Sequence, residues 1–336
     1  MEYRELGKTG VKVSAVGFGC WAMGGVGWGK VDDKESADAV NKAVDLGITF
    51  FDTAPSYGLG HSEQVLGKAL GNRRKDVFLA TKCGVEWDDK GEVWVNNSPA
   101  YVRKDCERSL NNLGCDKIDL LQVHWPDKSV PIADTIGEMA KLQKEGKIRF
   151  IGLCNLSVEQ VKEARKHADI ASFQIPYSML SRNVEVEYFG TSTLSMIKFC
   201  EQQGIGVIAC SCLQQGLLTG KFKEDSKFAE EDIRANSPLF TGDIFKIMVK
   251  MAEGIKGVVF KQGCTTAQFA INWVLQNSAV SVALAGMKRP SQAEENAGGA
   301  NCGINEEGIR EVNKIFQIAM EESRTKLGYK WMDKRS

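Results

Sequence analysis

Residues 48–54 read ITFFDTA, a short apolar run that ends close to a carboxylate, Asp52. Two runs of the same kind follow: VFLATKC at 77–83 contains Lys82, and IDLLQVH at 118–124 ends in His124. Short apolar runs rich in β-branched and aromatic residues are typical of strands buried on both faces. The sequence therefore predicts buried strands that each finish in an ionisable group.

The same pattern recurs along the chain and indicates the fold. Five further runs lie at 13–20, 148–154, 172–178, 206–212 and 280–286. Amphipathic stretches separate the runs, and they carry helix signals such as Ser98 before Pro99, Gly114 at a helix end, and Ser157 with Gln160. Eight strand–helix units predict an α/β chain folded as a (β/α)8 TIM barrel.

Additions to the barrel are expected at three places. A small hairpin is predicted at the N-terminus across residues 7–10. The segment 213–279 after strand seven is too long for one helix, so we expect a long irregular loop followed by extra helices. Residues from 305 predict one more C-terminal helix before a polar terminus. We expect residues 1–336 to form a single barrel domain.

A doubly wound sheet is the alternative fold. Gly17, Gly19 and Ala22 match the GxGxxA dinucleotide fingerprint directly after a strand. That fingerprint requires a helix to start within it, whereas this chain continues with MGGVGWGKV at 23–31. Four more glycines disfavour a helix before Asp32, so the barrel is the better prediction.

Composition narrows the class of protein. Lys plus Arg equals Asp plus Glu, 43 against 43, and no long basic run favours nucleic-acid binding. No apolar run is long enough for a membrane span, and MEYRELGKTG lacks the apolar core of a signal peptide. We therefore expect a cytoplasmic protein. The ten cysteines include no CxxC pair, so mostly buried free thiols are expected, with Cys210 and Cys212 the pair of most interest.

The polar groups at the strand ends predict one active site. The carboxyl ends of barrel strands lie on one face, which would gather Asp52, Lys82, His124 and, just beyond its strand, Tyr57. A lysine cation beside a tyrosine is expected to lower the phenol pKa from about 10, and a carboxylate would hold that lysine in place. A neutral histidine could orient a carbonyl oxygen. These four groups suit a reaction in which a proton is transferred to a carbonyl oxygen while hydride is transferred to the carbon. The three histidines of the chain are at unrelated spacings and do not predict a metal site.

Four longer stretches carry a family-specific signal. They are FDTAPSYGLGHSEQVLGKAL at 51–70, LATKCG at 79–84, DLLQVHWPD at 119–127 and GKIRFIGLCN at 146–155. Over nearly the whole chain the sequence resembles the aldo-keto reductase superfamily, in particular a bacterial branch that also resembles potassium-channel beta subunits. The resemblance implies that Asp52, Tyr57, Lys82 and His124 form a catalytic tetrad. Tyr57 would be the general acid, tuned by Lys82 and Asp52, and His124 would orient the carbonyl.

The resemblance also implies a site for NADP(H). Lys288 and Arg289 would face the 2′-phosphate, which favours NADP(H) over NAD(H). The full set of coenzyme positions comprises Trp21, Asp52, Asn155, Gln174, Cys210, Ser211, Leu213, Gly216, Leu217, Lys221, Gly286, Lys288, Arg289, Gln292, Glu295 and Asn296. The family usually has an aromatic residue at position 210, where this chain has Cys210.

The expected substrate is a small carbonyl or alcohol, possibly a sugar. Its pocket would be lined by Trp21, Tyr57, Trp87, His124 and Trp125. The expected reaction is metal-free interconversion of aldehydes or ketones and alcohols, with no nucleic-acid or membrane partner. Two alternatives stay open: a nucleotide-sensing regulatory subunit with little turnover, and a lyase that uses Lys82 as a Schiff base. The sequence does not identify an oligomeric state.

Overall fold

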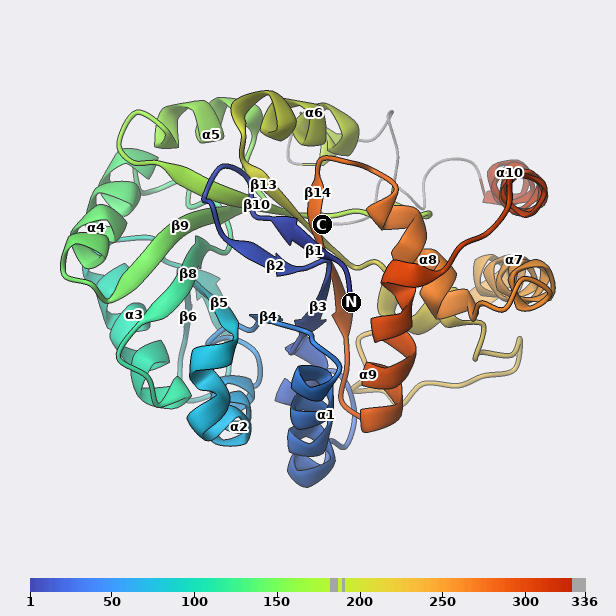
Figure 1. Ribbon diagram of the computed structural model, residues 1–336, viewed down its shortest axis with the longest axis horizontal. Coiled ribbons are helices and arrows are strands. Elements are labelled where there is room, and N and C mark those ends of the chain that lie inside the picture. The colour runs from blue at the N-terminus through green and yellow to red at the C-terminus, as the bar shows by residue number, and fades with distance from the viewer. Residues whose placement is uncertain (182–186, 189–190, 328–336) are drawn as a thin grey trace.

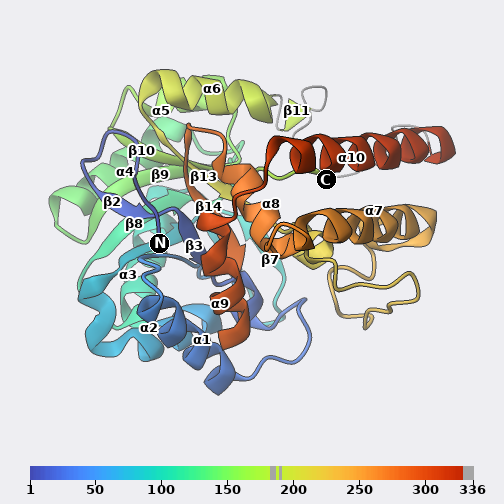
Figure 2. The same cartoon turned by 45° about the vertical axis from the view of Figure 1, so that its right-hand side comes forward.

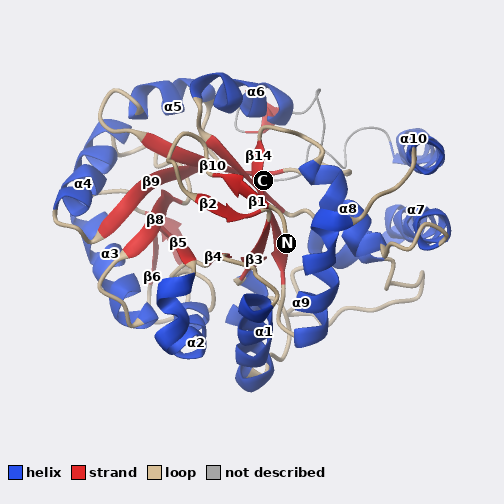
Figure 3. Ribbon diagram, in the orientation of Figure 1, coloured by secondary structure: helices blue, strands red, loops and turns tan. Residues whose placement is uncertain are grey.

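A computed structural model describes residues 1–181, 187–188 and 191–327. Eight parallel strands form a closed barrel, and β14 pairs with β3 to complete the ring (Figure 3). This confirms the predicted barrel and excludes the doubly wound sheet. The barrel strands are β3 (Val16–Gly19), β4 (Phe50–Asp52), β5 (Phe78–Cys83), β8 (Ile118–Val123), β9 (Ile148–Cys154), β10 (Ile170–Pro176), β13 (Gly206–Cys210) and β14 (Val280–Gly286).

Helices cover the outside of the barrel, where a large apolar core fills the space between the two layers (Figure 1). The predicted helix signals are confirmed: Ser98 caps α3 through the backbone N–H of Tyr101, and Ser157 and Gln160 form a capping box. The helices of this layer are α1 (Asp33–Asp45), α2 (His61–Leu70), α3 (Pro99–Leu113), α4 (Ile132–Lys144), α5 (Val158–Ala164), α6 (Thr193–Gln203), α8 (Thr266–Leu275) and α9 (Pro290–Ala297).

The glycine-rich segment after β3 differs slightly from expectation. The sequence predicts no helix before Asp32, and α1 does begin just after that residue, but a 3-10 turn forms at η1 (Trp21–Gly24). Such a turn needs only a short-range hydrogen bond, here from Met23 N to Cys20 O at 3.0 Å. Four more 3-10 segments are η2 (Gly71–Asp76), η3 (Gln214–Thr219), η4 (Pro238–Phe240) and η5 (Gly298–Asn301).

The predicted N-terminal hairpin closes the bottom of the barrel. Strands β1 (Tyr3–Glu5) and β2 (Lys12–Ser14) lie across the N-terminal ends of the barrel strands in Figure 1. Leu6 and Val13 from the hairpin are fully buried and join Phe50 and Phe78 in the interior core. The interior is thus packed with side chains and leaves only the opposite end of the barrel for chemistry.

Two short hairpins were not predicted. One, β6 (Val85–Trp87) with β7 (Val93–Val95), follows the strand that carries Lys82. The other pairs β11 (Glu187–Tyr188) with β12 (Thr191–Ser192). Both hairpins consist of strands of only two or three residues.

The extra helices after strand seven and at the C-terminus are confirmed. Helices α7 (Gly242–Phe260) and α10 (Glu306–Leu327) lie side by side and project away from the barrel (Figure 2). They bury a second apolar cluster that includes Met248, Ile255 and Phe316. Among the described residues no helix is both long and apolar enough to cross a membrane.

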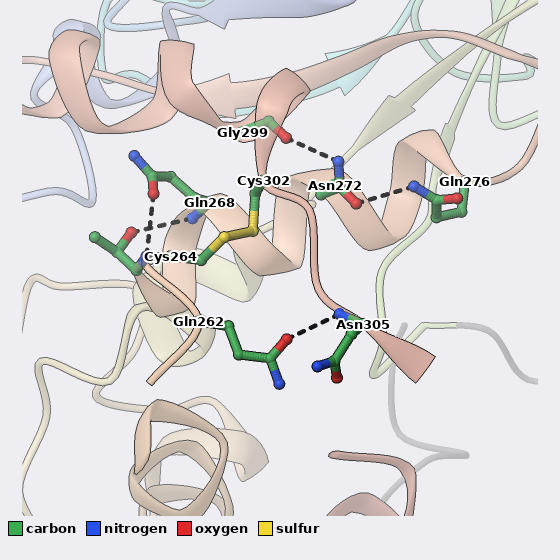
Figure 4. The surroundings of a disulfide bond; sticks show 9 residues. Gln262, Cys264, Gln268, Asn272, Gln276, Gly299, Cys302 and Asn305 are labelled. Carbon is green, nitrogen blue, oxygen red and sulfur yellow. Dashed lines mark hydrogen bonds between the residues drawn. A yellow bond between two sulfur atoms is a disulfide. The ribbon is translucent and has the colours of Figure 1, made fainter. Parts of the chain in front are cut away.

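The expectation of mostly buried free thiols is confirmed for eight of the ten cysteines, and one pair differs. Cys264 and Cys302 form a disulfide that links the start of α8 to the segment after η5 (Figure 4). The two residues are 38 positions apart, and packing of α8 against η5 brings their Cα atoms to 5.8 Å. No local sequence pattern reports a contact that tertiary packing creates. Cys210 and Cys212 are both free.

Candidate active site

The four residues of the predicted tetrad come from three neighbouring strands. Asp52 is the last residue of β4, Lys82 lies near the end of β5, and His124 directly follows β8. Tyr57 lies in the loop after β4. The parallel pairing of β4 with β5 and of β5 with β8 puts these positions on the C-terminal face of the barrel, where barrel enzymes carry their catalytic groups.

The Asp52 carboxylate is the hub of a buried polar network. Lys82 Nζ donates to Oδ1 at 2.5 Å, and the side-chain amides of Gln122 and Gln174 each donate to Oδ2 at 2.9 Å. Lys82 also donates to the carbonyl of Thr53 at 2.9 Å. Asp52 and Lys82 are each only 1% exposed, so the charged pair is stable only because these partners satisfy it.

Gln122 is a member of this network that the sequence analysis missed. It lies in β8, directly opposite Lys82 in the register between β5 and β8. Its amide donates to Asp52, and its Oε1 lies 3.7 Å from Cys154 Sγ. The signal was available in DLLQVH, where a glutamine interrupts an otherwise apolar strand two residues before His124.

Tyr57 is brought to the other tetrad members by contact between two loops. The centre of its ring lies 4.8 Å from Lys82 Nζ and 5.9 Å from the centre of the His124 ring. Gly58 has φ of +64°, and a Cβ added there would lie 2.2 Å from Gly24 O. Glycine is therefore required beside Tyr57, because the backbone after β3 touches the backbone after β4 at this point.

The protonation states favour an acid at Tyr57. Burial alone would lower the pKa of Lys82, but the Asp52 carboxylate and the Tyr57 phenol outweigh it, so the pKa is raised and the lysine stays charged. Desolvation raises the pKa of Tyr57 and outweighs the lowering effect of Lys82. The sequence-based expectation of a lowered phenol pKa is therefore wrong for this structure, because it considered the cation and left out burial.

The His124 side chain is a neutral imidazole at neutral pH. Desolvation, reinforced by the nearby Lys82 cation, lowers the pKa of His124 well below its ordinary value. The backbone carbonyl of His124 accepts a hydrogen bond from Asn155 Nδ2 at 2.9 Å, which ties the residue to the end of β9. A neutral ring can donate one hydrogen bond to a substrate oxygen at neutral pH.

Positively charged side chains lie close together at the predicted site for the coenzyme phosphates. Partial desolvation and three neighbouring cations lower the pKa of the Lys221 ammonium; the cations are Arg234, Lys288 and Arg289. The Lys221 side chain passes over Gly216, so that a Cβ there would lie 2.9 Å from Nζ. The predicted residues Lys221, Lys288 and Arg289 are thus brought together.

Arg234 is a second residue that sequence reasoning missed. Asp232 holds its guanidinium through two hydrogen bonds of 2.6 and 2.8 Å, and the group lies 5.5 Å from the Trp28 ring centre. The adjacent Ile233 N donates to Gly27 O at 3.0 Å. The long loop after β13 therefore joins the loop after β3, a contact between segments about 200 residues apart that no local pattern predicts.

The other predicted coenzyme residues differ in their locations and contacts. Cys210 is the last residue of β13, and Ser211, which follows it, has φ of +59°. Leu217 is buried in the apolar cluster of the projecting helices, so only its backbone could meet a ligand. Gln292 accepts from the backbone of Lys288 at 2.9 Å. Leu213 follows β13, Gly286 is the last residue of β14, and Glu295 and Asn296 lie in α9.

Aromatic rings lie beside two residues of the predicted tetrad, Tyr57 and His124. Trp21 is 41% exposed, and its ring centre lies 6.1 Å from that of Tyr57; Trp125 stacks beside His124 at 6.1 Å. Trp28, which was not predicted, meets Trp21 edge to face at 5.1 Å. Trp87 lies on the hairpin after β5. Within the described parts of the chain, no three His, Cys, Asp or Glu side chains gather to hold a metal ion.

A hollow of about 800 Å³ at the opposite, N-terminal end of β5 and β8 has a structural explanation. Its most enclosed cation, Arg74, donates to Asp119 at 2.8 Å and to the carbonyls of Val77 and Lys117 at 3.1 and 2.8 Å. Arg74 therefore joins the starts of two strands, as expected for the end of a barrel that serves stability.

Comparison with known proteins agrees with this geometry. The model of the Aldo/keto reductase family matches residues 15–317. The chain is 35% identical to the aldo-keto reductase YhdN of Bacillus subtilis, with 96% of each chain covered. It is 33% identical to an NADH-specific methylglyoxal reductase of Escherichia coli, with 91% of this chain and 95% of the relative covered.

A solved structure gives the same result. The glycerol dehydrogenase AKR11B4 from Gluconobacter oxydans superposes with a TM-score of 0.83 at 32% identity, covering 97% of this chain and 96% of that one. The family model spans the whole barrel, including all four residues of the predicted tetrad. The chain is a member of the aldo/keto reductase family, an oxidoreductase acting on carbonyls and alcohols.

Proposed function

We propose that this reductase uses NADP(H) and transfers hydride directly, with Tyr57 as general acid and base. The observation that carries the proposal is the chain of contacts from the Asp52 carboxylate to Lys82 Nζ at 2.5 Å and on to the Tyr57 ring at 4.8 Å. Tyr57 is protonated at neutral pH because desolvation raises its pKa. It can therefore supply the proton that a carbonyl oxygen needs during reduction.

His124 and Lys82 complete the proposed proton transfer. A neutral His124 donates a hydrogen bond to the carbonyl oxygen and orients it toward Tyr57. Once Tyr57 has given up its proton, the adjacent Lys82 cation stabilises the phenolate. Asp52, in turn, keeps Lys82 charged and fixed through the bond at 2.5 Å. When bound, the nicotinamide coenzyme supplies the hydride.

Lys82 is poorly suited to the alternative role of a Schiff-base nucleophile. A nucleophilic amine must be unprotonated, and this is usually achieved by a lowered pKa. Here the Asp52 carboxylate raises the pKa of Lys82 and accepts a hydrogen bond from its ammonium group. These contacts favour a lysine that acts as a fixed cation.

The preference for NADP(H) is supported by the cation cluster. A 2′-phosphate adds negative charge, and Arg234, Lys288 and Arg289 lie close enough to Lys221 to lower its pKa. Arg289 already pairs with Glu35 at 3.3 Å on the exposed side, so it can turn to a phosphate at little cost. One relative is named as NADH-specific, and family membership alone therefore does not decide between the coenzymes.

We infer a small, oxygen-rich carbonyl or alcohol as the substrate class. The names of two relatives point to three-carbon compounds, methylglyoxal and glycerol. Trp21 and Trp125 beside the tetrad provide flat surfaces that also suit a sugar ring.

The test is a panel of aldehydes, ketones and alcohols followed by coenzyme absorbance with NADPH and NADH. Wild-type protein should reduce short carbonyls faster with NADPH. Tyr57→Phe should abolish turnover while coenzyme binding changes less than about threefold, because only the proton donor is removed. Full turnover by Tyr57→Phe would show that another group is the acid.

A second candidate function rests on Cys210. A regulatory subunit that senses nucleotide with little turnover, as in the branch resembling potassium-channel beta subunits, could do without a flat ring against the nicotinamide. Burial raises the pKa of Cys210 to about 12, so the thiol is not a reactive group. Cys210→Tyr should leave coenzyme binding unchanged or tighter. Tight coenzyme binding with no multiple turnover on any carbonyl would favour this second function.

A further inference from the structure

The hairpin after β5 has little to hold it in place by itself. Its strands are three residues each, and Val93, Trp94 and Val95 on β7 are all exposed. An isolated two-stranded hairpin is marginal in water. Its position must therefore come from contacts with the rest of the protein, and helix α3 supplies three of them.

Helix α3 fixes the base of the hairpin with hydrogen bonds. The Asp105 carboxylate accepts from Gly84 N at 2.9 Å, two residues beyond Lys82. Tyr101 OH donates to Val85 O at 3.1 Å. Both side chains come from the same face of α3, and Asp105 is fully buried.

Arg108, one turn further along α3, extends this contact to Trp87. Its guanidinium carbon lies 3.8 Å from the centre of the Trp87 ring, while Nη2 donates to Asp105 and, at 3.2 Å, to Tyr101 OH. The planar guanidinium can stack on an indole and donate in its own plane at the same time, which an ammonium cannot do. Asp105 therefore holds the Arg108 guanidinium where it lies over the Trp87 ring.

The hairpin also reaches the residues beside the tetrad. A Cβ built at Gly91 in its turn would lie 3.8 Å from the Leu59 side chain, two residues after Tyr57. At the other end, Asn97 Nδ2 donates to the carbonyl of Trp125 at 2.8 Å. The hairpin thus lies between the Tyr57 loop and the loop that follows His124.

Stability alone does not account for the ionic pair. A fully buried carboxylate with an arginine is costly to desolvate, and apolar residues of similar size often stabilise as well or better. What the pair adds is a fixed direction for one aromatic ring. We propose that Arg108, held by Asp105, is a positioning residue for Trp87 and thereby sets which carbonyl substrates the pocket accepts. This inference rests on the proposed function and on the sequence-based expectation that Trp87 lines the substrate pocket.

The test compares two substrates in two variants and a control. Arg108→Lys keeps the charge for Asp105 and loses the planar stack; Arg108→Met loses both. The KM for a ring-bearing aldehyde such as benzaldehyde should rise about tenfold in each variant, whereas that for methylglyoxal should change less than about twofold. Arg103→Met, on the same helix but paired with Glu138 and Glu145, should affect neither substrate.

A double-mutant cycle separates positioning from general damage. In a Trp87→Leu background, Arg108→Lys should cause less than about a twofold further change in kcat/KM for benzaldehyde, because its effect acts through the missing ring. Thermal unfolding and NADPH binding check that each variant is folded. Additive effects, or equal losses for both aldehydes, would overturn the inference. If wild-type protein reduces no carbonyl at all, the proposed function fails and the inference falls with it.

Discussion

Lys82 Nζ lies 4.8 Å from the centre of the Tyr57 ring, yet the net effect of the site is to raise the pKa of Tyr57. The cation stabilises the phenolate, but the loss of water around the hydroxyl costs the phenolate more. The Tyr57 phenol is therefore protonated at neutral pH. In the proposed mechanism, this relationship gives the two directions of the reaction different pH dependences.

Carbonyl reduction should be nearly independent of pH between about 6 and 9, because Tyr57 stays protonated throughout. Alcohol oxidation requires the phenolate, whose fraction rises about tenfold per pH unit below the pKa. The oxidation rate should therefore climb steeply over the same range. Steady-state kcat/KM for both directions, measured in one buffer series, checks this. A fall in the reduction rate with a midpoint near pH 8 would mean that the phenol pKa is lowered instead.

Lys82→Met should lower the free energy of unfolding by about 3–5 kcal/mol, because it leaves the Asp52 carboxylate buried without its cation. Urea unfolding at pH 7 measures the loss. Lys82→Met combined with Asp52→Asn should recover part of it, since the remaining amide carries no charge. The exposed pair of Lys246 and Asp243 provides the control, and Lys246→Met should change stability by less than about 1 kcal/mol. Equal losses for the single and double variants would show that shape, and not charge, determines the cost.

Replacing both Lys288 and Arg289 by alanine should weaken NADPH binding about 30- to 100-fold and NADH binding less than threefold, because only NADPH carries the 2′-phosphate. Fluorescence titration of each coenzyme gives the two dissociation constants. Arg310→Ala, on the exposed face of α10, is the matched control for lost surface charge. A similar loss for both coenzymes would place the 2′-phosphate elsewhere.

Reducing the Cys264–Cys302 disulfide should destabilise the protein by about 4 kcal/mol, because the unfolded chain gains conformational entropy once a loop of this length is no longer closed. The difference between denaturant midpoints with and without a dithiol reductant measures it. Cys264→Ser should show the same loss and no further response to reductant. A variant as stable as the oxidised wild type would mean that packing of α8 against η5 already supplies the constraint.

The sequence predicted the parts of this protein that are periodic or lie at strand ends. The eight barrel strands were recognisable because each is a compact apolar run, and Asp52, Lys82 and His124 stood out as polar groups within such runs. Contacts made across the fold were not recognisable. Arg234 reaches the coenzyme side through a loop contact with Gly27, and Cys302 meets Cys264 only because two helical segments pack together.

The phenol pKa was mispredicted for a related reason. A sequence shows which charges a fold can bring near Tyr57, but it does not show how much water the fold removes. Trp87 illustrates the same limit. Its place near the catalytic strand could be predicted, whereas the guanidinium that lies on its ring comes from a helix about 20 residues later.

The hydrogen bonds of Asp52 have a consequence for how activity arises during folding. Its donors Lys82, Gln122 and Gln174 are 30, 70 and 122 residues away in the chain. Three strands besides β4 must therefore be in register before this carboxylate has its partners. A barrel in which β5, β8 or β10 has not docked would leave the Asp52 carboxylate buried without one of these donors. Regain of turnover on refolding should therefore follow the docking of these strands, later than secondary structure and later than collapse.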